Sequence, residues 1–291
     1  MTIARVRGLL WIMVLIVPVA CALAQVSKPP EAQLWSTPIF NRLIVAIEPA
    51  KGRPFDSIRQ IIEERIARAP VFPASTEKIR SDELFLLSPR NTVLRPSGWD
   101  RTFTWNWAEG GRDYILHAYS KDNEVFRRRM GDARRAVVSE REAPFVPGVV
   151  YSWDVSLCVE RCNLHLSSRA ALRPTFTLLS PAEEALVASD LVAVREWCEG
   201  SGIAGSEEET ALTALVLEAS GLFMEEQQLL GKELKKRPDS VLLALIHSGA
   251  LSAMNSSYGA RDEYEKARAF YEKETGSALG EIGPSPSPGH E

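Results

Sequence analysis

The sequence has little of what most enzyme sites are built from. Its 291 residues include only four cysteines and four histidines. No two histidines have the H-E-x-x-H spacing of a zinc protease, and no G-x-S-x-G element is present to hold a serine nucleophile. The 38 acidic residues are too plentiful for any one pair to stand out as a general acid and base. We therefore predict no catalytic residue, no metal site and no cofactor.

The chain also lacks a strong excess of charge of either sign. Its formal net charge is -4, from 34 basic against 38 acidic residues. Because a nucleic-acid-binding protein needs a basic face for phosphates, we expect no nucleic-acid partner. One local cluster of arginines departs from this balance, at positions 127, 128, 129, 134 and 135. We interpret it as a charged sheet edge, which resists pairing with other strands; contact with an anionic lipid or glycan is the alternative.

Long apolar runs are missing except near the N-terminus. Arg5 and Arg7 precede a continuous apolar run over residues 9–19, and small residues lead up to Gln25. This pattern is typical of a secretory signal peptide over residues 1–24, cleaved after Ala24. We expect a periplasmic or secreted protein with no integral membrane segment after cleavage.

Two alternatives to cleavage remain open. The apolar run could stay as an uncleaved anchor, although it is short for a spanning helix, which needs about 20 residues. The chain could also be lipidated at Cys21, although Pro18 stands where a bulky aliphatic residue is wanted.

The remaining three cysteines are interpreted for an oxidising compartment. Cys158 and Cys162 predict a small disulfide loop, provided that the three residues between them turn. Zinc would require a second ligand pair. Cys198, beside Trp197 on an apolar helix face, is expected to be a buried free thiol; pairing with Cys158 or Cys162 stays open.

Residues 25–80 form a linker and a short segment that is too small to fold alone. Residues 43–47 (LIVAI) predict a strand, and a helix follows from a cap at Asp56 or Ser57. Isoleucines at helical spacing mark its inner face, with Arg59, Glu63, Glu64 and Arg65 outside. We expect this segment to pack on the domain that follows.

Residues 81–180 alternate between apolar and polar positions in short runs separated by turns, which predicts an antiparallel β-sandwich. Trp105 and Trp153 are expected in its core. Trp99 lies in a turn-like stretch, residues 96–100, and is the candidate for an exposed binding aromatic. A carbohydrate-binding or cell-wall-binding role would use such a residue.

Residues 181–276 change to helical periodicity, and residues 277–291 form a tail rich in Gly, Pro and Ser that we expect to be disordered. Ser180 with Glu183 predicts a capping box. Residues 200–205 match G-x-G-x-x-G, but they follow a helix instead of a strand, so they predict an interhelix loop instead of a dinucleotide site.

The helices at 207–238 resemble a tetratricopeptide repeat. Gly221, Phe223, Leu230 and Pro238 match the motif, whereas Glu226 stands where the motif has a small alanine. The whole layout resembles uncharacterised bacterial envelope proteins that carry an L-x-P strand, here residues 87–89, and a P-G-x-x-Y-x-W-x-V strand, here residues 147–155. The resemblance implies an α+β protein: an immunoglobulin-like antiparallel β-sandwich (81–180) followed by tetratricopeptide-like helical hairpins (181–276). It implies no catalytic residues.

From these features we predict an exported, non-enzymatic binding or scaffold protein of the bacterial cell envelope. Its expected partner is an envelope protein or peptide held by the helical hairpins. A carbohydrate-binding or cell-wall-binding module is the alternative, and an unrecognised hydrolase is a third hypothesis.

Overall fold

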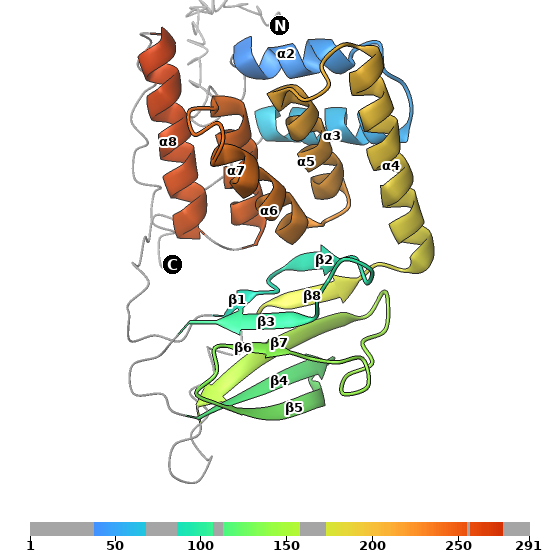
Figure 1. The fold of residues 1–291 in the computed structure, drawn as a ribbon, viewed down its shortest axis with the longest axis vertical. Coiled ribbons are helices and arrows are strands. Elements are labelled where there is room, and N and C mark those ends of the chain that lie inside the picture. The colour runs from blue at the N-terminus through green and yellow to red at the C-terminus, as the bar shows by residue number, and fades with distance from the viewer. Residues whose placement is uncertain (1–37, 68–85, 107–112, 158–172, 255–256, 276–291) are drawn as a thin grey trace, which may run out of the picture.

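The computed structural model describes residues 38–67, 86–106, 113–157, 173–254 and 257–275 (Figure 1). Within these ranges the chain is a mixed α+β protein with seven helices and two sheets. The helices gather in one layer and the sheets in another, as Figure 1 shows. The expected signal peptide with Ala24, the Cys158–Cys162 pair and the tail 277–291 lie outside the described residues.

The sheets have three and five strands. The smaller has the order β1 (Leu86–Ser88), β3 (Thr102–Trp105), β6 (Arg135–Val137). The larger has the order β2 (Thr92–Leu94), β8 (Thr175–Leu178), β7 (Val150–Leu157), β4 (Tyr114–Ser120), β5 (Asn123–Gly131). All neighbouring strands are antiparallel except β2 and β8. That parallel pair departs from the all-antiparallel expectation: β2 is the edge strand beside the helical layer, and its arrow points the same way as that of β8, which leads into the next helix.

One apolar core is shared by the two sheets. Phe103 and Trp105 reach it from the smaller sheet, and Tyr114, Trp153 and Phe176 reach it from the larger; all five side chains are fully buried. Except for Tyr114, these residues alternate with polar neighbours, in the period of two that a half-buried strand requires. The expectation that Trp105 and Trp153 are core residues is confirmed.

The prediction that Trp99 is an exposed binding aromatic is wrong. Its side chain is 7% exposed, and its ring lies 5.3 Å from the ring of Phe176 and 5.7 Å from that of Phe103. A turn causes this, since the backbone N–H groups of Gly98 and Trp99 both donate to the carbonyl of Arg95. The turn folds the indole back over the core, so a polar-looking stretch of sequence carries a core residue.

The helical layer holds α2 (Pro38–Ile47), α3 (Arg53–Ala67), α4 (Pro181–Gly200), α5 (Glu207–Ala219), α6 (Phe223–Leu234), α7 (Val241–Ala253) and α8 (Ser257–Thr275). Ser180 and Glu183 form the predicted capping box at α4. α7 lies at the centre of the layer, and ten consecutive residues of it are buried. Residues 200–205 lie at the end of α4 and in the loop before α5, as the interhelix interpretation predicted.

The segment before the sheets differs from its prediction in three ways. Residues 43–47 are helical instead of extended, because Leu43 and Ile47 are buried one turn apart while Val45 is exposed. A five-residue apolar run does not distinguish a helix from a strand. α3 begins at Arg53 instead of near Ser57, so Asp56 lies in its first turn and pairs with Arg59.

The third difference concerns packing. The segment was expected to pack on the β-domain, but α3 packs against α4 and α5, and α2 packs against α7. The isoleucines of α3 join the same apolar core as the C-terminal helices. The helical layer is therefore completed from the N-terminal side of the chain.

Candidate functional site

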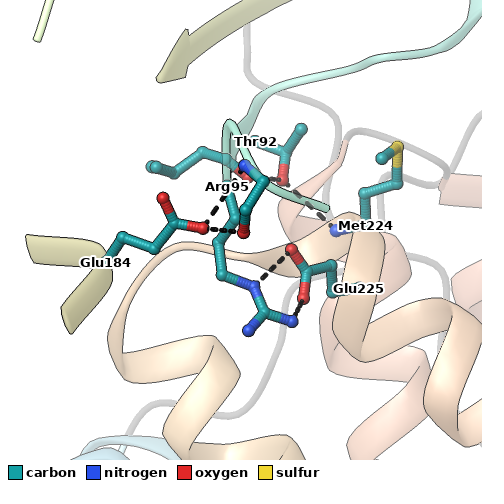
Figure 2. A network of polar contacts seen from close by, with 7 residues as sticks. Thr92, Arg95, Glu184, Met224 and Glu225 are labelled. Carbon is teal, nitrogen blue, oxygen red and sulfur yellow. Dashed lines mark hydrogen bonds and ion pairs between the residues drawn. The ribbon is translucent and has the colours of Figure 1, made fainter. Parts of the chain in front are cut away.

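The sheets and the helices are joined by a network of polar contacts (Figure 2). Arg95, in the turn after β2, donates from Nε to Glu225 Oε1 of α6 at 2.9 Å and from Nη2 to the other carboxylate oxygen. Ser97 donates its hydroxyl to Glu184 at the start of α4. The bidentate pair fixes both distance and orientation, and the hydrogen bond to Glu225 raises the pKa of Arg95 above its ordinary value.

Backbone contacts of β2 close the same junction. The N–H of Val93 donates to the carbonyl of Gly221 at 2.8 Å, and the N–H of Met224 donates to Thr92 Oγ1 at 3.2 Å. Gly221 has φ +71°, and a Cβ there would lie 2.9 Å from Val93 Cγ2. Glycine at 221 thus permits the turn between α5 and α6 to touch the sheet edge.

A polar relay crosses three strands of the larger sheet. His117 Nε2 lies 2.9 Å from Ser156 Oγ, and His117 Nδ1 lies 2.6 Å from Glu124 Oε2. This is the order of nucleophile, base and acid that serine hydrolases use. However, Ser156 is 4% exposed and sits within the regular pairing of β7 with β4. In this arrangement the relay links side chains of β7, β4 and β5.

Next to the relay, Asp154 is buried on the same face of β7. Arg173 Nε lies 3.3 Å from Asp154 Oδ2, and its guanidinium stacks on the ring of Tyr119 at 4.2 Å. Burial raises the pKa of Asp154, and the charge of Arg173 opposes this shift. The charge of Arg173 thus opposes that of Asp154 within the same cluster of side chains.

Most of the arginine cluster at the sheet edge is neutralised within the chain. The pairs are Arg128 with Glu142 at 2.8 Å, Arg129 Nε with Asp113 Oδ2 at 2.7 Å, and Arg135 with Asp100 at 3.2 Å. Arg128 also donates to the carbonyl of Val137, which links β5 to β6. The charged-edge interpretation fits these contacts better than a free basic patch for an anionic lipid or glycan.

A second ionic site lies inside the helical layer, where α3 meets the C-terminal helices. Arg65 of α3 donates to Glu218 of α5, with Nη2 at 2.5 Å and Nε at 3.1 Å from Oε1. Its guanidinium lies on the backbone of α7 at Gly249, where an added Cβ would come within 3.0 Å of Nη1, Nη2 and Cζ. We call Glu218, Glu226 and Gly249 the arginine socket.

Glu226 of α6 is the unusual member of the socket. It is 0% exposed, and neither carboxyl oxygen has a hydrogen-bond partner. Burial, and then the neighbouring Glu218, raise its pKa well above 4.5, while Arg65 opposes the shift. The socket therefore holds two carboxyl groups for one guanidinium, and Glu226 is stabilised as the neutral acid.

The sequence patterns did not reveal this site. The helical spacing predicted Arg65 on the outer face of its helix, and Glu226 stood out only as a departure from the small residue of the repeat motif. The available signals were a glutamate at an inward-facing helix position and Gly249 within a long apolar helix. Neither signal identifies a partner 153 positions away along the chain.

Other sequence-based site predictions have simpler outcomes. Cys198 is a buried free thiol, and burial followed by the charge of Glu209 raises its pKa to about 11. Among the described residues, no group of three or more His, Cys, Asp and Glu is arranged to hold a metal ion. Within the same ranges, none of the helices has both the length and the apolar character to cross a bilayer.

Comparison with known proteins adds no family to this description: no protein-family model matches the sequence, and neither does any curated protein.

Proposed function

We propose that this chain is an exported, non-enzymatic binding or scaffold protein of the bacterial cell envelope that mediates protein–protein interaction. In this proposal the sheets form an immunoglobulin-like β-sandwich, and α5–α6 and α7–α8 form two tetratricopeptide-like hairpins. Cleavage after Ala24 delivers the protein to the periplasm or the exterior, and Cys158 pairs with Cys162.

The observation that carries the proposal is that the helical layer already holds an amphipathic helix. α3 packs on α4 and α5 through Ile58 and Ile62, which are buried, and Arg65 fills the arginine socket. An apolar stripe with one ionic anchor is the way a groove recognises a helical segment. The surface that binds α3 offers the apolar and ionic groups that a partner helix would need in order to bind there.

The junction between the layers supports the scaffold role. Arg95 and Glu225 are mostly buried and held in bidentate geometry, while β2 is hydrogen-bonded directly to the α5–α6 turn. The sheets thereby hold the helical layer in one orientation, as a spacer must.

A crosslinking experiment in cells tests the proposal. A photoreactive phenylalanine analogue would replace Leu186 or Val192, which are exposed on α4, or Val125 or Val150, which are exposed on the sheets. We expect the protein in the envelope fraction with Gln25 at its N-terminus, and adducts with one envelope protein from the α4 positions. Location in the cytosol, or no adduct from any α4 position, would contradict it.

The non-enzymatic part is challenged directly by the Ser156–His117–Glu124 relay. A fluorophosphonate probe labels an activated serine, so we expect no labelling of the folded wild-type chain beyond the level of Ser156→Ala. Labelling that disappears in Ser156→Ala and His117→Ala would replace the scaffold proposal by a hydrolase.

The carbohydrate-binding alternative depended on Trp99, whose ring is part of the core. Retention of the full chain on peptidoglycan or glycan beads would favour that alternative over a protein partner.

A further inference from the structure

We propose that the arginine socket is the recognition element for the partner, and that the partner presents an amphipathic helix whose arginine replaces Arg65. This inference rests on the proposed function, and it adds the chemistry of the ligand and the autoinhibitory place of α3. The occupant to which we commit is a helix with apolar residues four positions apart and an arginine three positions after the second, the spacing of Ile58, Ile62 and Arg65.

The socket is built for a guanidinium. Glu218, Glu226 and Gly249 come from three different helices, α5, α6 and α7, so their convergence belongs to the packed hairpins. Gly249 leaves the backbone of α7 open where the planar group lies, because any side chain there would overlap it. A lysine ammonium would not match this arrangement, since it is compact and lacks the planar fork of donors.

The resident helix satisfies the socket incompletely. Arg65 donates to Glu218, yet both carboxyl oxygens of the fully buried Glu226 stay without a hydrogen-bond partner. A buried polar group that lacks a hydrogen-bond partner is costly and uncommon in folded proteins. A partner helix with a second donor next to its arginine would satisfy both acids, which gives it an advantage over α3.

The α3 helix is attached in a way that suits exchange. Among the described residues, the ion pair that α3 forms with another helix outside the socket is weak: Arg53 lies 3.7 Å from Asp190, and the Arg53 side chain is half exposed. Arg59 contacts its own neighbourhood, donating to backbone carbonyls at the end of α2, including that of Ile47 at 2.6 Å. The apolar stripe and Arg65 are thus what a competitor must replace.

The test measures binding of a helix in trans by fluorescence anisotropy. The probe is a labelled peptide of residues 51–67, and the receptors are the full chain and a full-chain Ile58→Ala/Ile62→Ala variant with a loosened α3. Since apparent affinity scales with the fraction of receptor whose site is open, we expect the loosened chain to bind at least about tenfold tighter than wild type.

Two controls make the test specific. An Arg65→Ala peptide should lose at least about tenfold in affinity. An Arg53→Ala peptide should bind nearly as the parent does, because the Arg53 side chain is half exposed and lies 3.7 Å from Asp190. Adding Gly249→Ala to the loosened chain should abolish binding. If the double variant fails to fold by circular dichroism, Phe55→Ala replaces it, since Phe55 packs on Trp197 away from the socket.

Equal binding of the parent and Arg65→Ala peptides, or no binding by a folded loosened chain, would overturn the inference. Its failure is distinguishable from failure of the proposed function. A crosslinked envelope partner that is retained by Gly249→Ala refutes the socket but keeps the scaffold. Binding of the peptide without any crosslinked partner in cells would support the socket and contradict the scaffold proposal.

Discussion

Gly249→Ala is the most direct perturbation of the helical layer. Alanine is the better helix former, and in an unobstructed helix this change stabilises by about 1 kcal/mol. At Gly249, however, the new methyl group occupies the space of the Arg65 guanidinium. Arg65 must move, and Glu218 then stays behind without its partner.

The magnitude follows from the burial of that pair. Breaking a fully buried ion pair costs about 3–5 kcal/mol. The side chains of Arg65 and Glu218 retain 14% and 13% exposure, so partial hydration lowers the cost to about 2–4 kcal/mol. After the gain in helix propensity, we expect a net destabilisation of about 1–3 kcal/mol.

Urea unfolding followed by circular dichroism measures this difference, with unchanged m-value as the sign that the native state is intact. The matched control is Gly231→Ala in α6, where the nearest atom to an added Cβ is Gln227 Nε2 at 3.9 Å. That variant should be more stable than wild type by up to about 1 kcal/mol. If Gly249→Ala is stabilised to the same extent as Gly231→Ala, the account of the arginine socket is refuted.

Three further results are expected. Trp99→Ala should lower the free energy of unfolding, measured in urea, by about 3–5 kcal/mol, because it leaves a cavity among core aromatic rings. A decrease of less than about 1 kcal/mol would indicate that the Trp99 side chain is exposed. Burial raises the pKa of Cys198 to about 11, so a thiol reagent at pH 8 should label it only after denaturation, as peptide mapping would show, and equal labelling of the native chain would argue against burial. Because the pKa of Glu226 is raised above 4.5 in the folded chain, the wild type should lose stability as pH rises from about 4.5 to the pKa of Glu226 in the folded state. Glu226→Gln should abolish this loss of stability. Parallel plots of stability against pH for the two chains would contradict the raised pKa.

Local patterns in the sequence predicted the parts of the fold that depend on local physics. The alternation around Trp153 predicted β7 with its buried face, and Ser180 with Glu183 predicted the start of α4. Both depend on neighbours within a few positions, either through strand pleating or through hydrogen bonds of the first helical turn.

Predictions that depended on distant contacts were wrong or missing. Residues 43–47 were expected to form a strand. A short apolar run indicates burial but does not distinguish the period of a helix from that of a strand. The segment is helical in the structure, where it packs against α7. Trp99 is buried by a turn whose local composition is polar. The inward orientation of Arg65 depends on Glu218 and Gly249, which no periodicity within α3 reveals.

The packing of α2 and α3 on the C-terminal helices also has a consequence for the order in which the chain is expected to fold. During synthesis, α3 emerges long before α5, and the pair of Arg65 with Glu218 closes a loop of 153 positions. Long loops form late because their closure entropy must be overcome first, so the sheets can pair before the helical layer is complete. A fragment containing only residues 181–276 would leave open the apolar surface that Ile58 and Ile62 cover. In terms of folding units, the sheets are therefore an insertion within one helical domain.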